Sequence, residues 1–440
     1  MFNVFNDVSK FNLDEYQNKV VYSESNNIAV VAGAGSGKTR VLTERIKYLL
    51  NNGVNPKSIV AFTFTKMAAD ELKQRLSDVV GNDKMFIGTI HSYANYILRK
   101  FSNTQYELLT DELVTNVMLD LCKRNKILPI TVDIYKDFIS MPYDSGKVYD
   151  IILEKYGYKV MITLRHILEF EPNKEFPITI KGVARVNNYI TFDELIAKAT
   201  DYFNSTGDFV DYLFVDEFQD IGHLEYRFIK SLCALNNFIV GDDYQSIYGF
   251  KGSSFTYFQN IIKNENWKVY YLINNYRCGI NILNYANKYI GYCETVIPKK
   301  SMSLTPYKGK YTTFNNIHSM IELINSKQLG DYKDWFILVR TNKELNNIFT
   351  ILQSKNIPVI TFKKSELTSD ELSDLLNSDS VKLLTIHASK GLESKNVIVY
   401  YPKVNLFNKG KDSDAIYNDE ELRVYYVACT RAKENLFVLP

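Results

Sequence analysis

Short apolar runs alternate with longer stretches of helical periodicity along this chain. The runs cover residues 27–32, 58–63, 212–215, 238–240, 381–386 and 396–400. Each has the length of a buried strand, and strands that alternate with helices predict parallel sheets covered by helices. The runs form an early and a late group that separate near residue 270. We therefore expect an α/β protein with two parallel-sheet domains and an active site in the cleft between them.

The stretch 93–189 has a different pattern. Leu113, Val117 and Leu121 recur at helical spacing, and little strand signal precedes residue 176. We expect a helical insertion at 93–189. The domains around it are then a first domain of residues 1–92 and 190–270 and a second domain of residues 271–440.

Three later segments also carry predictions. Residues 365–380 are polar enough for a surface connection, and residues 403–419 are expected to form a mobile loop. Residues 436–439 are expected to form a final strand.

Composition narrows the class of protein. The 440 residues are 46% hydrophobic and 23% charged, which is typical of an ordinary globular chain. Lys plus Arg is 52 and Asp plus Glu is 50, so the net charge of +2 attracts no polyanion globally, and any nucleic-acid site must be a local groove. The five cysteines have no metal-ligand spacing, and their odd number argues against a disulfide framework. We expect a cytoplasmic protein with no membrane partner.

A glycine-rich segment between an apolar run and a helical pattern is the strongest local signal. Its end, Gly37, Lys38 and Thr39, predicts a loop whose backbone N–H groups face the phosphates of a nucleotide at a helix N-terminus. Lys38 would contact the β and γ phosphates and Thr39 would hold Mg²⁺. Ala32 stands where the strict pattern has Gly, and a merely structural turn is the alternative. The residues expected to cradle the nucleotide are Gly33, Ala34, Gly35, Ser36, Gly37, Lys38, Thr39 and Arg40. The helix that follows should bury Leu42, Ile46, Leu49 and Leu50.

Two adjacent acids follow the apolar run at 212–215. Burying two carboxylates is costly unless they are paired or bind a metal, so their presence here favours a functional site. The alternative is that they cap the following helix. We expect Asp216 to bind Mg²⁺ through water and Glu217 to orient and deprotonate the attacking water.

Nine blocks, in this order, resemble those of superfamily 1 helicases of the UvrD, Rep and PcrA type. They lie at residues 13–17, 61–65, 88–92, 190–195, 215–220, 240–252, 274–277, 384–393 and 420–432. The resemblance implies two RecA-like motor domains, ATP and Mg²⁺ as cofactors, and DNA as partner.

The resemblance also assigns roles at the nucleotide. It implies that Gln17 reads the adenine edge, that Tyr276 stacks on adenine and that Glu393 contacts the nucleotide. Gln245 would sense the γ-phosphate, which Arg277 and Arg431 would reach from the second domain. The alternative for any single arginine is a surface salt bridge.

Further residues are expected at the DNA. The resemblance implies that Phe64, Tyr248 and Phe250 stack on bases, and it adds the DNA contacts His91, Lys251 and His387, with Tyr93 as a further candidate. The family usually has Trp-Arg where Phe250 and Lys251 stand, which predicts weaker DNA affinity. The alternatives are plain core aromatics and hydrogen-bonded loop histidines.

The implied function is an ATP-dependent single-stranded DNA translocase and helicase, acting 3′ to 5′ and at DNA junctions. Only residues 360–380 separate the segment at 335–342 from the strand at 381, so we expect the family's 2B accessory subdomain to be absent. A protein partner could then supply the wedge. The alternatives are an ATPase subunit of a repair, recombination or anti-phage complex, and a P-loop NTPase that acts on something other than nucleic acid.

Overall fold

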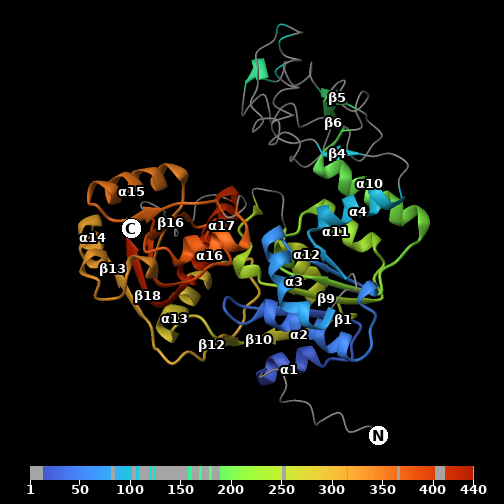
Figure 1. Cartoon of the computed structure of the whole chain (residues 1–440), viewed down its shortest axis with the longest axis horizontal. Helices are drawn as coiled ribbons and strands as arrows, with labels where there is room; N and C mark the ends of the chain where they lie inside the picture. Colours follow the sequence, from blue (N-terminus) through green and yellow to red (C-terminus); the bar gives the residue numbers. More distant parts are fainter. Residues whose placement is uncertain are drawn as a thin grey trace.

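The chain builds two parallel sheets, each covered by helices, in the computed structural model (Figure 1). The structure describes residues 13–80, 85–101, 106–108, 119, 123, 126, 157–160, 168–170, 178–180, 189–249, 254–314, 316–363, 367–401 and 412–439. No helix in this described part has both the length and the apolarity that crossing a bilayer requires.

The first sheet has the strand order β10-β1-β9-β8-β2-β3, and every neighbouring pair is parallel. The strands are β1 Asn27–Ala32, β2 Ile59–Phe62, β3 Phe86–Gly88, β8 Tyr212–Val215, β9 Asn236–Gly241 and β10 Lys268–Leu272. The four early apolar runs are thus strands, because strands of a sheet covered on both faces are hydrophobic nearly throughout. β10 extends this sheet to Leu272, two residues beyond the expected domain boundary.

Helices cover both faces of the first sheet. One hydrophobic cluster includes residues of α1 Glu15–Val21, α2 Lys38–Asn51 and α3 Lys66–Val80. The other includes residues of α4 Ile90–Phe101, α10 Phe192–Thr206, α11 His223–Ser231 and α12 Phe255–Ile262. In α2, Leu42, Ile46 and Leu49 are buried as expected. Leu50 is only half-buried, and Val41 takes its place in the stripe.

The second sheet is also parallel, with the order β13-β18-β17-β14-β16-β15. Its strands are β13 Lys310–Thr313, β14 Trp335–Val339, β15 Val359–Ile360, β16 Val381–Thr385, β17 Ser394–Tyr400 and β18 Ala432–Leu439. Its helices are α13 Ile280–Ile290, α14 Ile317–Ser326, α15 Asn342–Ser354, α16 Ser369–Asn377 and α17 Asp412–Cys429. The short strands β11 Asn274–Asn275 and β12 Met302–Ser303 pair beside it. We call residues up to Leu272 the first half and those from Ile273 the second half.

Both polar segments singled out in the second half contain part of a helix. The loop expected at 403–419 is wrong for residues 412–419, which form the first turns of α17, because the apolar C-terminal part of that helix is buried and its polar start continues the same helix. Residues 403–411 lie outside the described part. Residues 369–377 form α16, which begins with a capping box between Thr368 and Glu371 and buries Leu372. The final strand begins at Ala432, four residues earlier than predicted.

The expected helical insertion differs in its described pieces. α4 continues through residue 93, because Tyr93, Ala94 and Ile97 face the first core. Two short pairs of strands follow: β4 Glu107–Leu108 is parallel to β7 Tyr189–Ile190, and β5 Leu168–Phe170 is antiparallel to β6 Ile178–Ile180. β4 and β5 both precede residue 176, where little strand was expected. The periodic residues at 113, 117 and 121 lie outside the described part.

Candidate functional site

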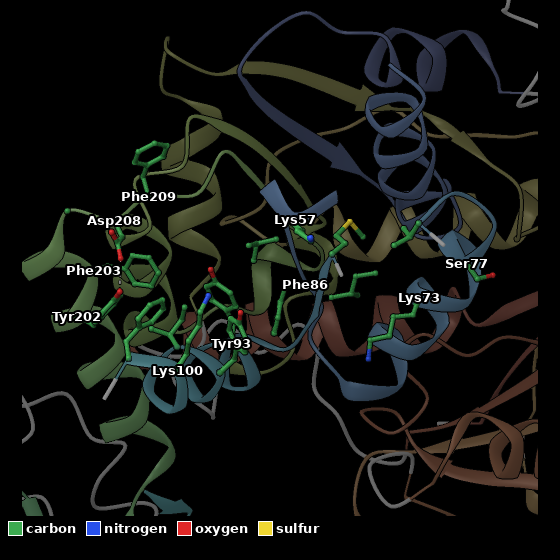
Figure 2. Close-up of a pocket in the computed structure, with 18 residues that line it drawn as sticks. Lys57, Lys73, Ser77, Phe86, Tyr93, Lys100, Tyr202, Phe203, Asp208 and Phe209 are labelled. Atoms are coloured by element: carbon green, nitrogen blue, oxygen red, sulfur yellow. Dashed lines mark hydrogen bonds between the residues drawn. The ribbon is translucent and has the colours of Figure 1, made fainter. Parts of the chain in front are cut away.

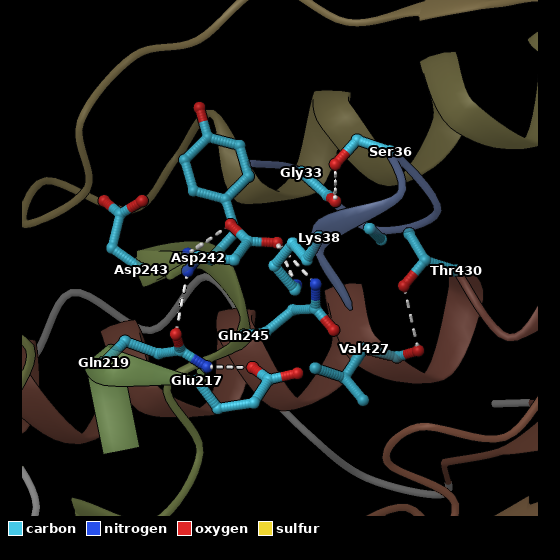
Figure 3. Close-up of polar contacts among 12 residues, drawn as sticks. Gly33, Ser36, Lys38, Glu217, Gln219, Asp242, Asp243, Gln245, Val427 and Thr430 are labelled. Carbon is cyan, nitrogen blue, oxygen red and sulfur yellow. Dashed lines mark hydrogen bonds and ion pairs between the residues drawn. The ribbon is translucent and has the colours of Figure 1, made fainter. Parts of the chain in front are cut away.

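The glycine-rich loop lies between β1 and α2, and two of its glycines have left-handed backbone. Gly35 has φ +66° and Gly37, which precedes the first turn of α2, has φ +87°. A Cβ at Gly35 would lie 2.6 Å from Cβ of Arg277, and one at Gly37 would lie 2.8 Å from Nε2 of Gln17. Ser36 closes the turn by donating its hydroxyl to the Gly33 carbonyl, 2.8 Å away (Figure 3). The loop therefore requires glycine at both positions and places backbone N–H groups at the N-terminus of α2.

The two acids lie beside this loop. The Thr39 hydroxyl donates to Oδ2 of Asp216 at 3.3 Å, so the first turn of α2 touches the residue that follows β8. Glu217 has φ +52°, which is rare for a non-glycine residue, and its N–H donates to Oδ1 of Asp216 at 2.9 Å. Gln219 donates to Oε2 of Glu217 at 2.5 Å. This network holds the Glu217 carboxylate in one orientation.

Burial and neighbouring charges shift the pKa values of the two carboxyl groups in opposite directions. Burial, followed by the charge of Glu217, raises the pKa of Asp216. Burial opposes ionisation of Glu217 as well, but the charges of Lys38 and Lys390 lower the pKa of Glu217. Glu217 is therefore an anion at neutral pH, as a proton acceptor must be.

The donors present fit a magnesium nucleotide. The hydroxyl of Thr39 and the carboxylate of Asp216 are hard oxygen ligands, which Mg²⁺ prefers, and phosphate oxygens commonly complete such sites. Within the described ranges, no group of three or more His, Cys, Asp or Glu forms a site that could hold a metal by itself. This donor set suits a cation that arrives with phosphate.

Two guanidinium groups reach the same place from the second half. Arg431, at the end of α17, is 1% exposed, and its Nη2 donates to Oε1 of Gln245 at 3.1 Å. Burial, followed by the charge of Arg277, lowers the pKa of Arg431 to about 9. Arg277 donates from Nε to Oε2 of Glu393 at 2.5 Å, and this ion pair lowers the pKa of Glu393 to about 2 against the effect of burial. The predicted residues Gln245, Arg277, Glu393 and Arg431 are thus gathered at the junction.

The expected adenine contacts lie on the other side of the loop. Gln17 is buried, and its Nε2 donates to the Ser36 carbonyl at 3.2 Å. Its Oε1 accepts from the Asp14 N–H in the capping box of α1. The Tyr276 hydroxyl donates to the Asp14 carboxylate, and the Tyr276 N–H donates to the Gly35 carbonyl at 2.8 Å. Burial, followed by the hydrogen bond to Asp14, raises the pKa of Tyr276 to about 12, and the charge of the exposed Arg40 opposes this rise.

Some of the expected DNA contacts also lie together. The rings of Phe64 and Tyr248 are stacked, with centroids 5.1 Å apart and planes at 20°. Phe64 is 41% exposed. The Tyr248 hydroxyl donates to the His387 carbonyl at 3.5 Å, and Nε2 of His387 lies 3.1 Å from the Ile247 carbonyl. These three residues therefore form one surface that joins the halves.

Two further DNA candidates, His91 and Tyr93, make other contacts in the structure. The His91 ring contacts Phe192 edge-on, with centroids 5.2 Å apart. Tyr93 is wrong as a DNA contact, because it is buried against Phe62 and Phe86 in the first core. Phe250 and Lys251 lie outside the described residues.

A hollow of about 1170 Å³ lies away from this site, between α3, α4 and the end of α10 (Figure 2). Aromatic rings and the side chains of Lys57, Lys73 and Lys100 line it. Of the predicted residues, only the rejected candidate Tyr93 faces it. Polar contacts such as that of Arg431 with Gln245 join the halves where the sequence predicts a cleft.

Sequence reasoning missed several charged residues at the junction. Lys390 binds the Asp220 carboxylate and donates to the Gln245 carbonyl at 2.8 Å. Lys299 binds Asp242 and Asp243. Asp220, Asp242 and Lys390 stand within the quoted blocks, which could have suggested them. Nothing local marks Lys299, because its partners are more than fifty residues away in the chain.

Family models match most of the chain. The UvrD/REP helicase N-terminal domain matches residues 13–266, and the UvrD-like helicase C-terminal domain matches residues 361–439. The two matched ranges contain every predicted nucleotide residue except Tyr276 and Arg277.

The chain is also similar to individual proteins named as DNA helicases. A probable DNA helicase of Mycoplasma pneumoniae is 30% identical over 470 residues, covering 97% of this chain and 83% of that protein. The ATP-dependent DNA helicase Rep of Buchnera aphidicola is 30% identical, covering 90% of this chain and 64% of its own length. The ATP-dependent DNA helicase PcrA of Leuconostoc citreum is 28% identical, with 79% of this chain and 49% of its own length covered. This chain thus spans between about half and four fifths of these relatives. It belongs to the UvrD/REP helicase family, whose members are DNA-dependent ATPases.

Proposed function

We propose that this chain hydrolyses ATP at the junction of its two halves and uses the cycle to move 3′ to 5′ along single-stranded DNA. The single observation that carries the proposal is the contact between Arg431 of the second half and Gln245 of the first at 3.1 Å. It joins the two halves where the nucleotide is proposed to bind. In this proposal, residues 1–92 and 190–270 are the first motor domain, 93–189 an accessory insertion and 271–440 the second motor domain.

The proposed chemistry divides between the halves. Lys38 binds the β and γ phosphates, Glu217 accepts a proton from the attacking water, and Gln245 contacts the γ-phosphate. Mg²⁺, held by Thr39 and Asp216, would supply positive charge to the phosphates. Arg277 and Arg431 stabilise the charge that develops on the γ oxygens, where one such arginine is worth about 10³–10⁵ in rate. Hydrolysis therefore requires both halves to be together.

DNA is proposed to cross the surface formed by Phe64, Tyr248 and His387. Stacking on aromatic rings is worth about 1–3 kcal/mol per base and hardly depends on sequence, which suits a translocase. Phe250, Lys251 and His91 are proposed as further contacts. Replacement of the family's Trp-Arg by Phe250 and Lys251 is expected to weaken the grip.

Strand separation is proposed to need help. Between β14 and β16 the described chain builds α15, β15 and α16, with only residues 364–366 outside the described part. This supports the absence of a 2B subdomain in that connection. A protein partner or a DNA fork would then supply the wedge, so unwinding is expected to be weak in the isolated chain.

Substitution of Lys38 tests the proposed site. Lys38→Ala should lower ATP turnover with single-stranded DNA at least 100-fold, because the phosphate contact is lost. Lys47→Ala, on the same helix and ion-paired with Asp78 at 3.3 Å, is the matched control and should keep turnover near wild type. Unchanged turnover in Lys38→Ala would mean that the site is misplaced. Turnover that single strands do not stimulate would favour an NTPase that acts on another substrate.

Tailed duplexes test direction and the need for a partner. Displacement should be faster from a 3′-tailed duplex than from a 5′-tailed one, and slow in both relative to ATP turnover on the bare strand. Rapid unwinding by isolated monomers would contradict the proposed need for a wedge. A preference for the 5′ tail would reverse the direction.

A further inference from the structure

Lys299 is a lysine of the second half that is buried against the first half. It lies in the loop between α13 and β12, and its side chain is only 4% exposed. Its ammonium group binds the carboxylates of Asp242 and Asp243, the latter at 2.6 Å. The same group lies 3.9 Å from the centre of the Tyr244 ring. Both carboxylates have no solvent exposure, so Lys299 neutralises charge that water cannot reach.

Asp242 connects this lysine to the proposed nucleotide site. It follows β9, and the Asp242 carboxylate accepts a hydrogen bond from Nε2 of Gln245 (Figure 3). The ammonium of Lys38 lies 3.9 Å from Oδ2 of Asp242. One buried carboxylate therefore has two lysines within reach, one from each half of the chain.

The two lysines differ in how closely they approach Asp242. Lys299 makes the closer pair with Asp242, whereas Lys38 lies at the outer limit of an ion pair. A buried carboxylate that loses its cation is strongly unfavourable and attracts any other cation nearby. Without Lys299, Lys38 would be that cation.

We propose that Lys299 is a positioning residue that binds Asp242 across the junction and thereby leaves Lys38 available for the phosphates of the nucleotide. This inference rests on the proposed role of Lys38. Arg423 supports the same turn, because its Nε donates to the Asp243 carbonyl at 3.0 Å and its guanidinium lies 4.1 Å from the centre of the Phe255 ring. Nucleotide binding by the loop of the first half thus depends on a residue of the second half.

Removal of the charge tests the proposal. Lys299→Met in the full chain should raise the KM for ATP at least tenfold, measured with saturating single-stranded DNA, while kcat falls less than threefold. Lys300→Met is the matched control, because Lys300 is the exposed neighbour, and its KM should stay at the wild-type value. Lys299→Arg keeps the charge and should stay within threefold of wild type.

A second substitution separates positioning from a merely structural role. Asp242→Asn removes the charge that would attract Lys38, so adding it to Lys299→Met should restore most of the lost affinity for ATP. A structural role would instead predict that the double variant is as weak as the single one or weaker. That result would overturn the proposal.

The remaining outcomes are also decisive. A KM in Lys299→Met equal to that of Lys300→Met, or a fall in kcat alone, would overturn the inference. If thermal unfolding shows that Lys299→Met does not fold, Lys299→Gln replaces it with the same expected KM. If neither folds, a tenfold rise of KM in Lys299→Arg would overturn the proposal and a wild-type KM would support it. Failure of the proposed function looks different, because Lys38→Ala would then retain turnover.

Discussion

At the scale of single residues, site residues within a local motif could be predicted from the sequence, whereas charged residues with distant partners could not. Lys38 and Thr39 could be predicted because a phosphate-binding loop needs glycines and a lysine at fixed spacing within one short segment. Lys299 could not be found in this way, since its carboxylate partners are distant in the chain and adjacent only after folding. Tyr93 was misjudged because an aromatic residue beside a motif has the same sequence signal whether it is exposed or buried.

His387 should make stability depend on pH. Burial, followed by the charge of Arg340, lowers the pKa of His387 to about 4; Lys390 acts in the same direction, and Glu421 opposes it. Between pH 6.5 and 4 the unfolded chain binds a proton there that the folded chain does not. Stability therefore falls as pH falls through this window, by up to about 3 kcal/mol.

His387→Asn should reduce that loss, so the difference in free energy of unfolding between pH 7 and pH 4 should be smaller in the variant. Thermal or denaturant unfolding at several pH values measures it. His318→Asn, at an exposed histidine, is the control and should keep the wild-type slope. Equal slopes in His387→Asn and wild type would contradict the prediction.

At the scale of elements, the strands were predicted well because buried parallel strands are continuous apolar runs. α16 and the start of α17 were missed, since both are polar and their only local signal is a cap or the continuation of a buried helix. The short strands β4 to β7 were missed because two- and three-residue pairings leave no periodic pattern.

The capping box of α10 gives a prediction at this scale. The Thr191 hydroxyl accepts from the Glu194 N–H at 3.2 Å, and Glu194 accepts in turn from the Thr191 N–H at 2.9 Å. Thr191→Ala should therefore lower the free energy of unfolding by about 1 kcal/mol. Asp201→Ala, on the exposed side of the same helix, should change it by less than about 0.5 kcal/mol, as surface substitutions usually do. Equal effects in chemical denaturation would contradict a role for the cap.

At the scale of the whole molecule, the separation into two sheets near residue 270 was predictable from the spacing of the apolar runs. The way the halves meet was not, because it depends on ion pairs such as Lys390 with Asp220 and on the close approach of Gly35 to Arg277. Contacts of this kind involve one residue from each half and leave no pattern in either.

Gly35 should therefore matter to the assembly of the halves. Gly35→Ala places a Cβ 2.6 Å from Cβ of Arg277 on a left-handed backbone, so the second half must shift away from the loop. We expect the midpoint of thermal unfolding to fall by several degrees, for a cost of about 1–3 kcal/mol. Gly33→Ala is the control, because a Cβ there meets nothing within 4 Å, and its midpoint should be unchanged. A Gly35→Ala midpoint like that of Gly33→Ala would contradict the close approach.

The stacked pair of Phe64 and Tyr248 has a consequence for the coupling between DNA binding and ATP hydrolysis. The two rings already touch, so a nucleobase can enter between them only by prising them apart. Tyr248 would then push on the backbone of His387, which lies three residues before Lys390, and Lys390 donates a hydrogen bond to the Gln245 carbonyl. We therefore expect DNA binding at these rings to change the position of Gln245 at the γ-phosphate. ATP turnover should then be low in the absence of DNA.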